Sequence, residues 1–186
     1  KTGLLNRETI YYEYLSKYSY QTKFFTYGNI KDLKIISPDS KLMIYCADFY
    51  VFSRFIKFKV FKSFFQVISI VLSSKNMDII KTNQLKASLP ALFLKIIFSK
   101  PFYLRIGYEP FMNRMISGRR NIFKDNFIYL FSKISYSMSN IISVTCANQK
   151  DFIVKKYGIS KEKIHILPNW IDHHSFYNFN KEKRKN

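Results

Sequence analysis

The stretch that decides the fold runs Lys163-Ile-His-Ile-Leu-Pro-Asn-Trp-Ile-Asp172. Residues 164–167 form an apolar segment of strand length. Pro168 ends this segment because proline has no backbone N–H to donate to a sheet. A polar turn and a further apolar residue follow, and we expect the chain to leave the domain there. Pro168, Asn169 and Asp172 lie in this exit segment.

Working outward from this strand, short apolar segments alternate with segments of helical periodicity. Such strands, apolar on both faces, are typical of a parallel sheet with helices on each side. The sequence thus predicts an α/β, doubly wound, Rossmann-like domain over residues 1–172, with 173–186 as a basic tail that starts an interdomain linker. Strands are expected at 22–27, 42–47, 77–81, 102–106, 141–145 and 164–167, and helices at 3–18, 52–72, from 88 to before Pro101, 123–138 and 147–157.

Two of these helices carry a stripe of apolar side chains that we expect to face the core. Ser88 is the expected N-cap of the first, with Pro90 tolerated in its first turn. Gly158 is the expected C-terminal cap of the 147–157 helix. The stripes comprise Leu89, Leu92, Phe93, Ile96 and Ile97 in one helix, and Phe123, Phe127, Leu130, Phe131, Ile134 and Met138 in the other.

Composition limits the classes of protein and partner. The 186 residues are 47% hydrophobic and carry a net charge of +19. They can therefore form a sizeable core, and the positive field favours nucleic acid, acidic lipid headgroups or phosphorylated substrates. A plain solvated basic surface is an equally good interpretation of the charge. The apolar run 64–72 is too short to span a bilayer, which needs roughly 20 residues.

Cysteine and histidine usage argues against a disulfide framework or a metal site. Cys46 and Cys146 lie in separate apolar segments, so we expect two buried free thiols. His173 and His174 are adjacent but lack a Cys or carboxylate cluster at ligand spacing, so no metal is expected. His165 alternates outward on its strand and is interpreted as structural.

The segment 52–72 admits two interpretations. It is apolar nearly all round, with four basic residues in its first half. A helix buried in the core is the preferred interpretation. The alternative is a helix on a membrane surface, because such helices mix basic residues with phenylalanine.

Several motifs in order along the chain resemble those of the GT-B glycosyltransferases of the large retaining family 4. The glycine-bearing start, Lys1-Thr2-Gly3-Leu4-Leu5, resembles the family's first loop. The segment Arg105-Ile-Gly-Tyr-Glu109 is similar to a subgroup that carries Arg-x-Gly-Tyr. Residues 78–84, 139–145 and 157–176 supply the remaining matches. In the last of these segments, the resemblance implies that Pro168, Asn169 and Asp172 form the motif at the junction of two domains. The resemblance covers nearly the whole chain and identifies it as the N-terminal, acceptor-side half of such an enzyme, with the first, central strand of the sheet apparently missing before Lys1.

The resemblance implies transfer of a sugar from a nucleotide-sugar to an acceptor, with retention at the anomeric carbon. In the family the acceptor sits on this domain, and the donor sits mostly on a C-terminal domain with two glutamates spaced by seven residues. The nucleotide-sugar is a substrate, and no cofactor or metal is expected. Gly3 is the candidate donor-phosphate loop, since a glycine at a helix N-terminus lets a phosphate approach backbone N–H groups.

Acceptor-binding candidates follow from the ligand position in open α/β sheets, beyond the C-terminal ends of the strands. Arg105 is expected to pair with a phosphate or carboxylate. Tyr108 is expected to stack on a sugar face. Glu109 is expected to bind acceptor hydroxyls and is a weak candidate for the catalytic base, which otherwise stays unassigned. Gln84 is the fourth acceptor-binding candidate, and Asp48 is a weaker one.

The leading hypothesis is the acceptor-side half of a glycosyltransferase that builds a bacterial surface polysaccharide on a glycan or lipid-linked acceptor. The basic charge would hold it on the inner face of the cell membrane as a peripheral cytoplasmic protein. The alternative is an inactive truncated remnant, or a half-enzyme that requires a separate donor-domain chain. In either case we expect the isolated chain to be inactive. A nucleic-acid-binding module fits less well, because the aromatic residues follow core periodicity.

Overall fold

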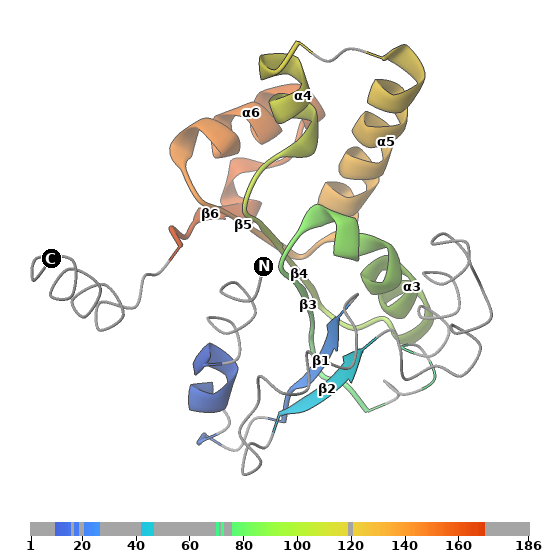
Figure 1. Ribbon diagram of the computed structural model, residues 1–186, viewed down its shortest axis with the longest axis vertical. Helices are drawn as coiled ribbons and strands as arrows, with labels where there is room; N and C mark the ends of the chain where they lie inside the picture. Colours follow the sequence, from blue (N-terminus) through green and yellow to red (C-terminus); the bar gives the residue numbers. More distant parts are fainter. Residues whose placement is uncertain are drawn as a thin grey trace, which may run out of the picture. The chain divides into compact units, whose positions relative to one another are not determined.

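The computed structural model describes residues 10–15, 17–18, 21–26, 42–46, 70, 72, 76–118 and 121–169 (Figure 1). The chain divides into two compact units. The first unit comprises Lys1–Ile70 and Asp172–Asn186, and the second comprises Val71–Ile171.

The first unit contains a parallel pair of strands and a helical segment. Strands β1 (Lys23–Thr26) and β2 (Met43–Cys46) pair along their full length. Residues 10–15 are helical, and the buried Tyr12 ring packs edge-on against Phe24, with centroids 5.5 Å apart. The strands expected at 22–27 and 42–47 are thereby confirmed. The Gly3 loop lies outside the described residues, as does nearly all of 52–72.

The second unit is built on a four-stranded parallel sheet in the order β3-β4-β5-β6. In register, Ile80 lies opposite Phe102, Leu104 opposite Ile142, and Ile142 opposite Ile164. These side chains form the centre of the core and are buried. The strands are β3 (Ile80–Thr82), β4 (Phe102–Ile106), β5 (Ile141–Val144) and β6 (Ile164–Ile166).

Helices connect these strands in the expected α/β alternation. Because the strands are added in one direction and such crossovers are right-handed, the connecting helices belong to one face of the sheet. Helix α3 packs on β3, β4 and α5, and α6 packs on β5 and β6 (Figure 1). The helices are α3 (Ser88–Phe98), α4 (Pro110–Ile116), α5 (Ile122–Met138) and α6 (Ala147–Tyr157), with short 3-10 turns η4 (Leu85–Ala87) and η5 (Lys161–Lys163).

The buried face of α3 differs from the predicted one. Leu92 is buried as expected, but the remaining members of the predicted stripe are exposed. The helix is apolar nearly all round, so periodicity alone did not decide which face meets the sheet. The small side chains of Ser88 and Ala91 lie on the buried side, where they allow close approach. The exposed members of the predicted stripe are Leu89, Phe93, Ile96 and Ile97.

Helix α5 departs further from the prediction, because its buried face consists of Ser132, Ser135 and Tyr136. The Ser135 hydroxyl donates to the Phe131 carbonyl at 2.8 Å, so its polar group is satisfied within the helix. Small hydroxyl residues therefore replace the expected apolar contacts against the sheet. The predicted core stripe was wrong in orientation: Phe123, Phe127, Leu130 and Ile134 are exposed.

The residues at the helix ends can be compared with the predicted caps. Ser88 is not the N-cap of α3, because η4 leads directly into the helix and Ala87 holds the N-cap position. Pro90 does lie in the first turn, as expected. Gly158 caps α6 in the left-handed conformation, with φ of 69°, and donates its N–H to the Val154 carbonyl at 3.0 Å. Helix α4 was not predicted.

The left-handed Gly158 yields a first prediction. Gly158→Ala should lower the free energy of unfolding by about 1 kcal/mol, because a Cβ disfavours positive φ. Gly107→Ala is the matched control, since an added Cβ there meets nothing within 4 Å and the residue has no positive φ. Urea denaturation measures both values. Equal stability of the two variants would contradict the capping role of Gly158.

Candidate functional site

Loops that follow four parallel strands meet at one edge of the second unit's sheet. Gln84 follows β3, residues 107–109 follow β4, Thr145 follows β5, and residues 167–169 follow β6. The carboxyl ends of parallel strands lie at the same edge, which is where ligands bind in open α/β folds. The structure therefore places the candidates Gln84, Arg105, Tyr108 and Asn169 on this one edge.

Arg105 and Asn169 are joined by a hydrogen bond across the sheet edge. Arg105 lies near the end of β4, and its Nη2 donates to Asn169 Oδ1 at 2.9 Å. Asn169 follows β6, so the long side chain crosses the end of β5. The bond links the predicted acceptor-binding residue with the predicted junction motif. Guanidinium carries five N–H donors, and among the described residues this one side-chain bond engages it.

Gln149 connects two of the loops, although the sequence analysis did not single it out. Its Nε2 donates to the Gly107 carbonyl at 3.2 Å, and its Oε1 accepts from the Thr145 N–H at 3.1 Å. The Thr145 hydroxyl also lies 3.3 Å from the Gly107 carbonyl. The sequence could have indicated this role through the position of Gln149. It is the third residue of α6, where a glutamine side chain can reach back toward the start of the helix.

Tyr108 and Gln84 differ in their surroundings. The Tyr108 side chain is 41% exposed in the loop after β4, so part of its ring faces solvent at the site edge. Gln84 is half-buried, holds the N-cap position of η4, and makes no capping hydrogen bond with its side chain. Both residues are thus available at the edge where an acceptor-binding role was predicted.

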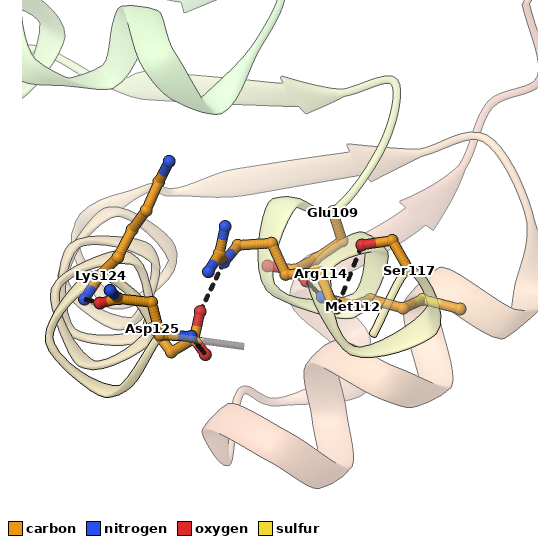
Figure 2. A network of polar contacts seen from close by, with 7 residues as sticks. Glu109, Met112, Arg114, Ser117, Lys124 and Asp125 are labelled. Atoms are coloured by element: carbon orange, nitrogen blue, oxygen red, sulfur yellow. Dashed lines mark hydrogen bonds and ion pairs between the residues drawn. The ribbon is translucent and has the colours of Figure 1, made fainter. Parts of the chain in front are cut away.

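Glu109 lies beneath this edge, because its side chain is only 1% exposed. One carboxylate oxygen accepts from the Tyr157 hydroxyl at 2.8 Å and the Tyr136 hydroxyl at 3.2 Å. The other accepts from the Met112 N–H and so caps α4 (Figure 2). A buried carboxylate requires such donors, and these contacts engage it with the protein itself.

The two tyrosines that bind Glu109 are held as neutral donors. Burial raises the pKa of Tyr136 well above its ordinary value, and the nearby negative charge of Glu109 raises it further. The pKa of Tyr157 is raised by the same two causes, in the same order. The two rings pack edge-on with centroids 5.0 Å apart, and Tyr129 stacks on Tyr157. Through Glu109, this packed cluster is joined to the loop that carries Tyr108.

A second polar contact holds α4 against α5. Arg114 of α4 forms an ion pair with Asp125 of α5, and Figure 2 shows the guanidinium reaching across to the carboxylate. The other Asp125 oxygen accepts from the Asn121 N–H at 3.1 Å, while the Asn121 side chain caps α5 through the Lys124 N–H. Helix α4 is therefore held at its start by the Glu109 cap and near its end by the Arg114–Asp125 ion pair.

The remaining candidates divide into described and undescribed residues. His165 and Pro168 are exposed, and His165 agrees with its predicted outward orientation. Cys146 was expected to be buried but is exposed, because β5 ends at Val144 and Cys146 falls in the following turn. Gly3, Asp48, Asp172, His173, His174 and the Cys46 side chain lie outside the described residues.

The described residues contain neither a cluster of metal ligands nor a membrane-spanning helix. Within these ranges no three His, Cys, Asp or Glu residues are grouped as metal ligands would be. No helix among the described residues combines the length and apolarity that crossing a membrane requires.

Comparison with known proteins shows similarity at the level of structure. The chain is similar to the crystal structure of Anabaena Alr3699/HepE in complex with UDP and glucose, with a TM-score of 0.57 and 9% identity, over 91% of this chain and 40% of that one. A second structure of HepE, in complex with UDP-glucose, also gives a TM-score of 0.57, at 8% identity, over 96% of this chain and 44% of that one. No family model matches the sequence. No curated protein matches it either.

The chain has a Rossmann-like α/β fold. This agrees with the parallel sheets and helices described above and confirms the predicted α/β, Rossmann-like class. The chain spans less than half the length of the HepE chain that it matches.

The buried carboxylate generates a second prediction. Glu109→Ala should lower the free energy of unfolding by about 2–4 kcal/mol, because it leaves two tyrosine hydroxyls and a helix N–H without their acceptor. Tyr108→Phe, one residue earlier and exposed, should change stability by less than about 0.5 kcal/mol. Chemical denaturation of both variants measures the difference, and a near-neutral Glu109→Ala would contradict the anchoring role.

The raised pKa values of the tyrosines generate a third prediction, about pH. A phenol whose pKa is higher in the folded state contributes stability that is complete below the unfolded pKa of about 10 and is lost as pH rises above it. The double variant Tyr136→Phe/Tyr157→Phe lacks both phenols. Its stability deficit relative to the parent chain should stay constant from pH 7 to 9 and shrink above pH 10. A deficit that is independent of pH up to 11 would rule out the neutral, buried phenols.

Proposed function

We propose that the chain is the acceptor-side part of a glycosyltransferase that transfers a sugar from a nucleotide-sugar to a glycan or lipid-linked acceptor. The observation that carries the proposal is that Arg105, held by Asn169, and the exposed Tyr108 lie at the same edge of the sheet. The Rossmann-like fold shared with a protein solved with UDP-glucose supports a nucleotide-sugar as the donor.

Each residue of the edge has a chemical task in this proposal. Arg105 pairs with a phosphate or carboxylate of the acceptor, because a planar guanidinium binds such groups through two parallel hydrogen bonds. Tyr108 packs its ring on a sugar face. Gln84 binds sugar hydroxyls. Glu109 is a positioning residue that joins the loop of Tyr108 to the tyrosine cluster, and its burial supports this role over proton transfer.

The donor side is proposed to lie mainly in a further domain, either in a longer polypeptide or in a separate chain. The coverage of less than half of HepE supports this division. Departure of a nucleoside diphosphate develops negative charge that fixed donors must stabilise. We assign the Gly3 loop to that task, with retention of anomeric configuration, in a family 4-like enzyme of bacterial surface polysaccharide synthesis at the inner membrane face.

Binding of a lipid-linked acceptor tests this proposal. The probe is a short polyprenyl-diphosphate monosaccharide in detergent, titrated into the chain by calorimetry. Arg105→Ala and Tyr108→Ala should each weaken binding about tenfold, because each removes a principal contact to the diphosphate or the sugar. Tyr108→Phe keeps the ring and should bind nearly as the parent does.

Lys155→Ala is the matched control for the loss of one positive charge, because Lys155 is exposed on α6, outside the proposed site. Equal loss of affinity in Lys155→Ala and Arg105→Ala would contradict a specific site at the sheet edge. The isolated chain should transfer no sugar from UDP-glucose to this acceptor. Turnover by these 186 residues alone would contradict the proposed division into acceptor and donor parts.

A further inference from the structure

Helix α5 presents an apolar ridge to solvent. Phe123, Phe127, Leu130 and Ile134 are 88%, 70%, 58% and 42% exposed. At 3.6 residues per turn these positions share one narrow face that is about 16 Å long. The opposite face of the same helix, with Ser132, Ser135 and Tyr136, is the one buried against the domain. The ridge is therefore a consistent outward face of a well-packed helix and not a frayed end.

Lysines flank this α5 ridge on both sides. On a helical projection, Lys124 and Lys133 lie about 90° to either side of the ridge centre, and both are exposed. Residues 110–138 contain five basic residues and one acidic residue. That acidic residue, Asp125, is paired with Arg114. The apolar face is thus bordered by positive charge that has little local compensation.

We propose that the α5 ridge is a docking surface for an anionic lipid bilayer. The two phenylalanines, with Leu130 and Ile134, enter the boundary between headgroups and acyl chains. Lys124 and Lys133 remain at the level of the headgroups and contact their phosphates. This combination of an apolar face containing Phe and Leu with lysines on its borders is typical of helices that lie in a membrane interface.

Charge and chemistry favour a bilayer over other occupants. A second copy of the chain would bring two net charges of +19 together, so self-association through this basic surface is opposed by repulsion. A nucleic acid would match the charge, but only two of the four ridge side chains are aromatic, and Leu130 and Ile134 offer no ring on which bases stack. Met115, Ile116 and Ile122, at the C-terminal end of α4 and the N-terminal end of α5, are also exposed.

The α5 ridge consists of other residues than the segment 52–72, for which a helix on a membrane surface was one expectation. It also does not depend on the proposed sugar transfer, because none of its residues belongs to the sheet edge. Membrane docking and acceptor binding can therefore fail independently of each other.

Vesicle flotation with the full chain tests the inference. The vesicles contain either phosphatidylcholine alone or phosphatidylcholine with phosphatidylglycerol. The parent chain should bind the anionic vesicles and lose affinity as salt rises. Phe123→Gln/Phe127→Gln should weaken binding about tenfold or more. Phe123→Leu/Phe127→Leu keeps an apolar ridge and should stay within about threefold of the parent.

A second pair of variants separates local from overall charge. Lys124→Gln/Lys133→Gln and Lys155→Gln/Lys161→Gln each remove two positive charges from exposed positions. The first pair flanks the ridge and should weaken binding to anionic vesicles more than the second pair does. Circular dichroism verifies that each variant is folded, which is expected because the substituted side chains are exposed.

Three outcomes would overturn the proposal. The first is that Phe123→Gln/Phe127→Gln binds anionic vesicles as the parent does. The second is equal binding of the parent to neutral and anionic vesicles. The third is that sedimentation shows the parent to be a dimer that the same substitutions dissociate without a change in vesicle binding, which would assign the ridge to self-association.

Discussion

The buried carboxylate of Glu109 is the interaction on which the rest of the second unit depends. A charge without access to water is costly unless donors surround it. Here the donors come from Tyr136 of α5, Tyr157 of α6 and the first turn of α4. One side chain therefore links three helices to the loop after β4. The arrangement also places the loop carrying Tyr108 next to the packed rings of Tyr129, Tyr136 and Tyr157.

The sheet edge combines this aromatic cluster with two links between loops. Gln149 ties the loop after β4 to the turn after β5, and Arg105 reaches Asn169 beyond β6. Fixed loops hold polar groups in place before a ligand arrives, which reduces the ordering cost of binding. The proposed acceptor site thus uses the parallel sheet as a rigid support, while the α5 ridge lies on another surface of the unit.

Much of the fold could be predicted from local patterns. The expected strand at 102–106 and helix at 147–157 agree with β4 and α6 because their periodicity and terminal residues are unambiguous. The faces of α3 and α5 could not be predicted in this way. An all-round apolar helix gives no preference, and the buried serines of α5 look polar in sequence although they suit close packing against a sheet. Arg105 and Tyr108 could be proposed as site residues from the sequence because ligands of such folds bind beyond the strand ends.

By itself, the sequence determined the parallel α/β class, the positions of most strands and helices, and the candidates at the ends of strands, because these depend on neighbouring residues. The tertiary structure alone decided that Glu109 is an anchor, that Gln149 joins two loops, and that the apolar stripe of α5 faces outward. The physical reason is distance along the chain. The hydroxyls that satisfy Glu109 belong to residues 27 and 48 positions away, and only the folded chain brings them to it.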